Sequence, residues 1–136
     1  MSFELYLQCF GETERLGLPR DSIRALFPVD EASSEPDYWR LRYDSQNSCD
    51  IGVHNLPTDV TKLADFYVER PCRDIRLWDS LFTVLNMGSV VLFFPEGPLI
   101  ISKGISGTGI PQEMVDSLGA PVQVNSGEEL RKIVEA

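Results

Sequence analysis

The sequence predicts a single α+β domain, with one mixed or mostly antiparallel β-sheet on which three to four helices pack. Residues 3–9 and 38–43 each alternate apolar and polar side chains, with the period of two that is typical of a half-buried strand. Residues 72–87 carry apolar side chains at helical spacing. A length of 136 residues is ordinary for one domain, so the domain is expected to span residues 1–136.

The first half of the chain is predicted to hold a strand, a short helix and a hairpin. Pro19 fits the first turn of the helix, where its missing N–H costs no hydrogen bond, and Pro28 ends the helix. The predicted elements are a strand over 3–9, a helix over 19–27, a polar loop over 30–37, and hairpin strands over 38–43 and around Ile51 and Val53.

The second half is predicted to alternate strands with helices. Pro71 fits the first turn of its clearest helix, Asp74 complements the positive end, and Gly88 follows the last turn. Ser126 and Glu129 form a capping box for the last helix. The predicted elements are strands over 62–69, 90–94, 99–101 and 121–124, and helices over 72–87, 111–118 and from 126 onward.

The chain is acidic, and this restricts its partners. Its 21 acidic and 12 basic residues give a net charge of −9, of which −6 falls in residues 1–60. Such a charge repels nucleic acids and anionic membranes and attracts basic proteins. We therefore expect a basic protein partner, no nucleic acid and no membrane, although solubility alone also explains an acidic composition. The longest apolar run, residues 90–94, is too short to span a bilayer.

The cysteines indicate neither a metal site nor a disulfide framework. Cys9, Cys49 and Cys72 have no paired spacing, and the single His54 does not complete a zinc site with them. No metal and no cofactor is predicted. Cys9 and Cys49 lie in alternating apolar segments and are interpreted as core residues of a protein from a reducing compartment. The N-terminal residues have no signal-peptide pattern, so we expect a cytoplasmic protein.

The segment 70–74 is the strongest candidate for a small-ligand site. A cysteine at a helix N-terminus between arginines has a lowered thiol pKa, and the arginines can hold an anion with the free N–H groups of the helix. A nucleophilic cysteine also needs a base, for which only His54 is available. This alternative anion or ligand site comprises Arg70, Cys72, Arg73 and His54, and a weak enzymatic activity would be an extension of it. The simpler interpretation is that Cys72 is a packed thiol at the start of a helix.

No other pattern indicates catalysis, so the protein is not expected to be an enzyme. The loop 104–109 lies between a strand and a helix but lacks the Gly-Lys-Ser/Thr ending of a phosphate-binding loop. Neighbouring carboxylates occur only in polar loops or at helix starts, where they stay solvated.

Aromatic residues on the outer face of the predicted strands are candidate binding anchors. Tyr6 and Phe10 lie on this face of the first strand, and Tyr38 lies on that of the hairpin. Exposed tyrosines often anchor protein complexes, and acidic neighbours favour basic partners. The alternative interpretation is that helices cover this face and that the aromatic residues belong to the core. The predicted partner-binding residues are Glu12, Glu14, Asp30, Glu31, Glu35, Asp37 and Tyr38.

From residue 69 onward the chain also resembles a class of bacterial proteins. The segments that carry the likeness are 69–72, 77–81, 88–97, 111–114 and 118–121, within a stretch of about half the chain. They resemble small uncharacterised bacterial proteins of the immunity type, encoded beside polymorphic toxins or secretion loci. The resemblance implies a neutralising role, and it assigns no functional residue because the matching positions are mainly turn and core residues.

These observations predict a cytosolic protein-binding domain, of immunity type, that neutralises a basic toxin or effector by occlusion. The small-ligand or anion-binding domain described above is the first alternative. A regulatory or structural subunit whose exposed hairpin edge pairs with a second copy, forming a homodimer, is the other.

Overall fold

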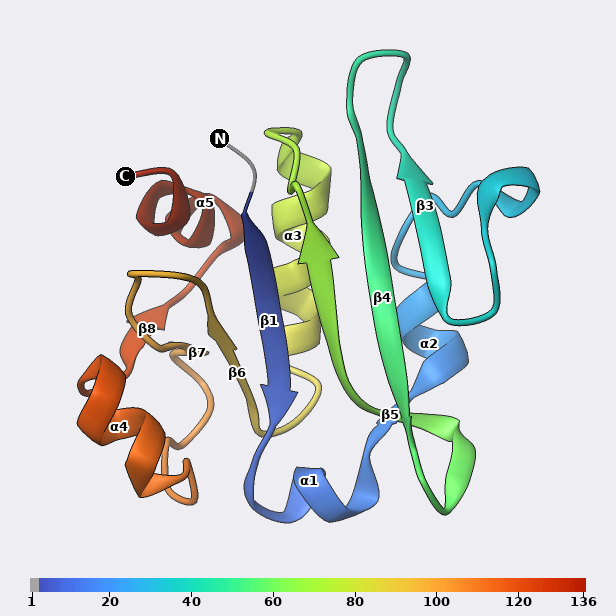
Figure 1. Cartoon of the computed structure of the whole chain (residues 1–136). Helices are drawn as coiled ribbons and strands as arrows, with labels where there is room; N and C mark the ends of the chain where they lie inside the picture. The colour runs from blue at the N-terminus through green and yellow to red at the C-terminus, as the bar shows by residue number, and fades with distance from the viewer. Residues whose placement is uncertain (1–2) are drawn as a thin grey trace.

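A computed structural model of the chain describes residues 3–136 and contains one mixed β-sheet of eight strands (Figure 1). The strands are β1 (Glu4–Cys9), β2 (Leu18–Pro19), β3 (Tyr38–Arg42), β4 (Ser48–Leu56), β5 (Asp59–Glu69), β6 (Val90–Phe93), β7 (Ile100–Ser102) and β8 (Val122–Val124). Their order is β3-β4-β5-β1-β6-β7-β8, with β2 paired to β5. Only the β7–β8 pairing is parallel within the described residues, so the predicted α+β class and mixed sheet are confirmed.

The helices that the sequence predicts are present, and one short helix was not predicted. The helices within residues 3–136 are α1 (Gly11–Leu16), α2 (Arg20–Arg24), α3 (Ile75–Leu85), α4 (Gln112–Leu118) and α5 (Gly127–Glu135), with a 3₁₀ turn, η1 (Glu31–Ser33). The additional helix is α1, which buries none of its side chains. It therefore has no apolar periodicity by which a sequence pattern could indicate it.

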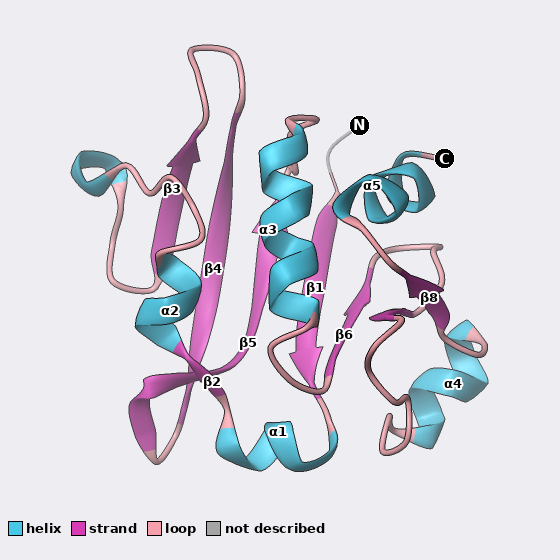
Figure 2. Ribbon diagram, turned by 180° about the vertical axis from the view of Figure 1, so that it is seen from behind, coloured by secondary structure: helices cyan, strands magenta, loops and turns pink. Residues whose placement is uncertain are grey.

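Two cores lie on opposite faces of the sheet. The main core is between the sheet and α2, α3 and α5, which cover one face (Figure 2). A smaller core lies on the other face at the β6–β7 end, beneath α4. Phe10 lies on the predicted side of the sheet but is fully buried in this smaller core, so its predicted role as an exposed binding anchor is wrong. The alternation of β1 ends at Cys9, and Phe10 already belongs to the segment that leads into α1.

Helix α3 begins at Ile75, three residues later than predicted. Asp74 is its N-cap, and the Asp74 carboxylate accepts the backbone N–H of Arg76 at 3.0 Å. A side-chain acceptor of this kind satisfies one of the free N–H groups of a first turn, whereas a proline has no side-chain acceptor to offer. The predictions that Pro71 lies in the first turn and that Cys72 stands at the helix N-terminus are therefore wrong. The helix also ends before the predicted Gly88, at Leu85, with Asn86 as C-cap.

The outer edge of β3 is covered by the chain that precedes it. The Asp30 N–H donates to the Arg40 carbonyl at 2.8 Å, and the Arg42 N–H donates to the Pro28 carbonyl at 3.1 Å. Isolated bridges join Val29 to Leu41 and Glu35 to Tyr38. The hairpin edge on which pairing with a second copy depends is therefore partly occupied by residues 28–35.

Candidate functional site

The face of the sheet opposite α2 and α3 is uncovered across β3, β4, β5 and β1 (Figure 1). Every second side chain of these strands points to this face, while the intervening ones, such as Leu5 and Ile51, enter the main core. Helix α4 covers only the β6–β7 end of the same side. We call this surface the open face; it comprises Glu4, Tyr6, Gln8, Tyr38, Arg40, Asp50, Gly52, His54, Asp65, Tyr67, Glu69 and Phe93.

An aromatic row runs across the middle of the open face. The strand register aligns Tyr38 with Gly52, Gly52 with Tyr67, Tyr67 with Tyr6, and Tyr6 with Phe93. The Tyr6 and Phe93 rings are stacked, with centroids 5.3 Å apart, and the Tyr6 and Tyr67 centroids are 6.5 Å apart. Because adjacent strands are about 4.8 Å apart, the row is roughly 19 Å long. We call these five residues the aromatic row.

Gly52 determines where the Tyr67 ring lies. A Cβ atom at position 52 would overlap that ring, so the ring lies directly over the glycine. The ring of His54, on the same strand, is 6.0 Å from the Tyr67 ring between centroids. The missing side chain at Gly52 therefore lets the Tyr67 ring extend across β4.

A row of charged side chains lies next to the aromatic row. The register aligns Arg40, Asp50, Glu69 and Glu4 across β3, β4, β5 and β1. The Asp50 side chain is only 2% exposed, and its carboxylate binds Arg40 and, at 3.2 Å, Arg70. A buried carboxylate requires such partners, and the two arginines balance the Asp50 charge. Glu69 and Glu4 have no comparable guanidinium partner within residues 3–136, so this row is acidic at its β1 end.

Two tyrosine hydroxyls bind the carboxylates of this charged row. The Tyr38 hydroxyl donates to Glu69 Oε2 at 2.6 Å, and the Tyr6 hydroxyl donates to Glu4 Oε2. Burial and the bond to Glu69 raise the pKa of Tyr38, and the bond to Glu4 raises the pKa of Tyr6. Both phenols therefore stay protonated at neutral pH and hold the carboxylates in place.

On the other side of the aromatic row, the register aligns His54 with Asp65 and Asp65 with Gln8. His54 Nδ1 and Asp65 Oδ1 are 2.6 Å apart, and the two side chains are 63% and 43% exposed. The open face thus carries an aromatic middle, with ionic and hydrogen-bonding groups along both sides.

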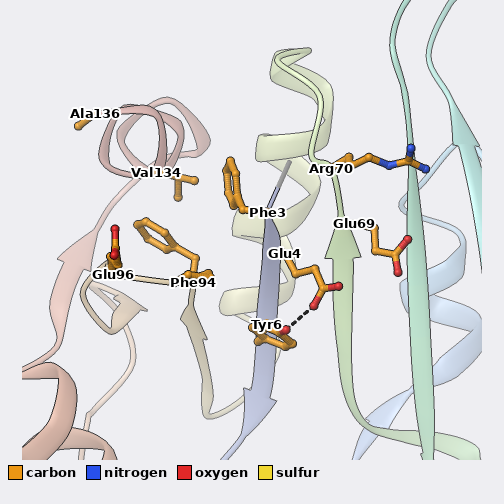
Figure 3. Close-up of a pocket in the computed structure, with 10 residues that line it drawn as sticks. Phe3, Glu4, Tyr6, Glu69, Arg70, Phe94, Glu96, Val134 and Ala136 are labelled. Carbon is orange, nitrogen blue, oxygen red and sulfur yellow. Dashed lines mark hydrogen bonds between the residues drawn. The ribbon is translucent and has the colours of Figure 1, made fainter. Parts of the chain in front are cut away.

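A hollow of about 820 Å³ opens at the upper end of the open face in Figure 3. Phe3, Phe94 and Val134 form its apolar middle, with Glu4 and Glu69 on one side of them and Glu96 on the other (Figure 3). Arg70 also lines the hollow, but its guanidinium is directed toward β4, where it binds Asp50. The lining is therefore acidic and aromatic, which suits a cationic or amphipathic group better than an anion.

The structure does not bring the seven predicted partner-binding residues together. Glu12 and Glu14 lie on α1 at the lower end of the sheet, whereas the other five lie around η1 and β3 (Figure 1). Tyr38 alone among the seven belongs to the open face. Four of the carboxylates form ion pairs with arginines: Glu12 with Arg15, Asp30 with Arg42, Glu31 with Arg24, and Asp37 with Arg20. Much of the acidic charge predicted for binding is thus balanced within the chain.

The four residues of the alternative site are also separated. His54 lies on the open face, whereas Cys72 packs against the main core on the helix-covered side, where its thiol contacts that of Cys49. Arg70 is bound to Asp50, and Arg73 is exposed. His54 therefore does not reach the Cys72 thiol as a base, and the four residues form no common pocket.

Tyr67, Phe93 and Asp50 are central to the open face, and none of them was among the residues predicted to bind. Residues 62–69 were predicted as a strand, and no binding role was assigned to Tyr67. The inward positions of Phe66 and Val68 would have indicated that Tyr67 points outward. The alignment of these residues in rows depends on strand order, for which the sequence contains no local signal.

Within the described range, residues 3–136, no group of three or more His, Cys, Asp or Glu side chains could hold a metal ion. Nor does any helix of that range combine the length and apolar character needed to cross a membrane. A scan against protein-family models, a search of curated proteins and a search of solved structures find no match to this chain.

Proposed function

We propose that this protein is a binding domain for a basic protein and that the open face of the sheet is its binding surface. The observation that carries the proposal is the aromatic row of Tyr38, Gly52, Tyr67, Tyr6 and Phe93, which no helix covers across β3, β4, β5 and β1. Tyrosines that are rigid and partly exposed are frequent energetic centres of protein complexes, because they bury a large area at a small cost in side-chain entropy.

The charges of the open face support a basic partner. Its four carboxylates, from Glu4, Asp50, Asp65 and Glu69, outnumber the two guanidinium groups of Arg40 and Arg70 that lie with them. The chain as a whole carries a charge of −9, which accelerates encounter with a basic protein and weakens binding as salt rises. The partner is expected to place apolar or cationic side chains on the aromatic row and its basic groups along the two flanking rows.

The mechanism that we propose is occlusion. The resemblance of residues 69–121 to immunity-type proteins supports a toxin or effector as the partner, encountered in the cytoplasm. The aromatic row is about 19 Å long, a length that fits within a standard interface, which buries roughly 800 Å² on each partner. A complex on this face would cover the basic surface with which such a partner binds its own target.

The alternative proposal, an anion site at Arg70, Cys72 and Arg73, has less support. Of these residues only Arg70 lines the hollow, and its charge is already balanced by Asp50. Three carboxylates face the same hollow and would repel an anion.

The test begins with a pull-down of the tagged protein from lysate of its source organism, followed by affinity measurement with the purified partner. Replacing both Tyr6 and Tyr67 with alanine should weaken binding by about 30-fold or more, the scale of an interface hot spot. Glu12→Gln/Glu14→Gln on α1 serves as the control and should change affinity by less than about threefold. Circular dichroism checks that all variants are folded.

Two results would contradict the proposal. One is the capture of no basic protein at low salt. The other is loss of binding in the α1 variant with full binding in the Tyr6→Ala/Tyr67→Ala variant, which would move the binding surface from the open face to the acidic residues predicted from the sequence.

A further inference from the structure

Two of the three cysteines meet at one corner of the fold. Cys49 is 3% exposed and points from β4 into the main core. The register pairs Asp50 with Glu69, the last residue of β5, so Cys49 lies near the point where the chain leaves the strand at Arg70. Arg70 has a left-handed backbone, with φ of 51°, and the chain turns there toward the helix-covered face. This turn returns Cys72 to the main core, which also contains Cys49, and the interaction between the two thiols shifts the pKa of each.

The surroundings make the two thiols chemically unequal. Cys72 is half-buried, and hydrogen bonds from the Cys49 thiol and the Asp74 N–H lower its pKa to about 7. The bond to Cys72 and burial raise the pKa of Cys49. Because a thiolate is the attacking species in thiol oxidation, Cys72 is the residue that reacts first, and Cys49 is placed to react second.

A third polar group lies in this corner. The Tyr43 hydroxyl is buried and has no hydrogen-bond partner among residues 3–136. Burial and the charges of the two cysteines raise its pKa, so it remains a donor. An unsatisfied buried O–H is costly, and an oxygen added to Cys72 would introduce an acceptor into the same part of the core.

We propose that Cys49 and Cys72 are an oxidation-sensitive thiol pair that hydroperoxides convert to an intramolecular disulfide. The Cys72 thiolate attacks the terminal oxygen of the hydroperoxide; an S–O bond forms, the O–O bond breaks, and the leaving alkoxide or hydroxide takes up a proton. The Cys49 sulfur then attacks the sulfur of the resulting sulfenic acid, forming the S–S bond and releasing water. In sum, two thiols lose two protons and two electrons, and the hydroperoxide is reduced to an alcohol or water, with one further water formed.

Cys9 provides a matched control within the chain. It is 2% exposed on β1, and burial raises the pKa of its thiol to about 12. Strand β5 separates β1 from β4, so Cys9 does not share the corner of the other two cysteines. We therefore expect Cys9 to remain reduced under conditions that oxidise the pair.

The experiment exposes the reduced full chain to hydrogen peroxide at neutral pH, then alkylates it under denaturing conditions and maps its peptides by mass spectrometry. Free thiols should fall from three per chain to one, with Cys49 linked to Cys72 and Cys9 alkylated. Cys9→Ser should behave like the wild type. Cys49→Ala should stop at a sulfenic acid on Cys72, which dimedone traps. The oxidised protein should melt about 10 °C higher than the reduced one, because the bond closes a loop in the unfolded chain.

Alkylation by iodoacetamide provides a second readout that does not depend on peroxide. The rate at Cys72 should be half-maximal near pH 7 in the wild type, and Cys49→Ala should shift that midpoint upward because the hydrogen bond is lost. The proposal is overturned if Cys49 and Cys72 stay alkylable after a peroxide dose that oxidises free glutathione. It is equally overturned if the disulfides that form join different chains or include Cys9.

Discussion

At the scale of single residues, Gly52 shows how one missing side chain shapes the open face. Glycine in a strand interior is unfavourable by roughly 0.5–1 kcal/mol relative to alanine, because it loses more conformational freedom on folding. Here the ring of Tyr67 takes the space that a Cβ would need. The strand therefore tolerates a poor strand former, and the aromatic row gains a ring that lies across β4.

Gly52→Ala should displace the Tyr67 ring and lower the free energy of unfolding by about 1–3 kcal/mol, the range typical of overpacking. The urea midpoint and the near-ultraviolet circular dichroism of the tyrosines measure the two effects. Gly104→Ala is the matched control, because the nearest atoms to a Cβ there are 3.8 Å away. That substitution should change stability by less than about 0.5 kcal/mol, and equal losses in the two variants would show that Tyr67 is not held by the glycine.

At the scale of elements, the start of α3 depends on one carboxylate. Asp74 accepts the backbone N–H of Arg76 at 3.0 Å and pairs with its guanidinium at 2.7 Å. These contacts, led by the side-chain bond to Arg76, lower the pKa of Asp74 to about 2, from an ordinary value of 3.8. A carboxyl whose pKa falls on folding stabilises the folded state above its unfolded pKa and loses that effect as the pH drops through its folded pKa.

Asp74→Ala should therefore destabilise the protein by about 1 kcal/mol at pH 7, the usual value of an N-cap. The difference from the wild type should shrink between about pH 4 and pH 2 and vanish below that range, as measured by urea unfolding across pH. Ser126→Ala removes the cap of α5, where the Ser126 hydroxyl accepts the Glu129 N–H at 3.1 Å, and its cost should not depend on pH. A pH-independent cost for Asp74→Ala would show that the ionised carboxylate is not what caps the helix.

The elements with strong local patterns were predictable, and those defined by long-range contacts were not. The alternation in residues 3–9 and 38–43 predicted β1 and β3, and Gly119 and Ser126 marked the end of α4 and the start of α5. The start of α3 was misplaced because Pro71 and Asp74 are competing start signals. Strand β2 is only two residues long and exists through its pairing with Leu63 and Lys62 of β5, so no local pattern indicates it.

The candidate sites were predictable only in part, for the same reason. Alternation alone placed Tyr6 and Tyr38 on an outer face, but they are 32 residues apart in sequence, and their alignment depends on three strand pairings. Cys49 and Cys72 have no paired spacing, and they meet because of the β4–β5 register and the left-handed Arg70. The partner-binding residues were chosen by charge, and the arginines that balance four of them come from segments up to seventeen residues away in sequence.

At the scale of the whole molecule, the two cores differ in size and in how far they bury the helices that pack on them. The main core joins β1, β3, β4 and β5 to α2, α3 and α5. The smaller core has five fully or nearly buried residues, and α4, which covers it, buries none of its own side chains completely. Helix α5 is of similar length but buries Leu130 and Val134 against the main core.

Because local stability follows the burial of apolar contacts, α4 should open without the rest of the molecule. In hydrogen–deuterium exchange, its amides should exchange at least about tenfold faster than those of α5, the matched control of similar length. Such opening would uncover Val91 and Phe10, which lie on the same side of the sheet as the open face, and would extend that face toward β6. Equal exchange rates in α4 and α5 would instead show one cooperative unit, in which the open face ends at β1 and at the exposed edge of Phe93.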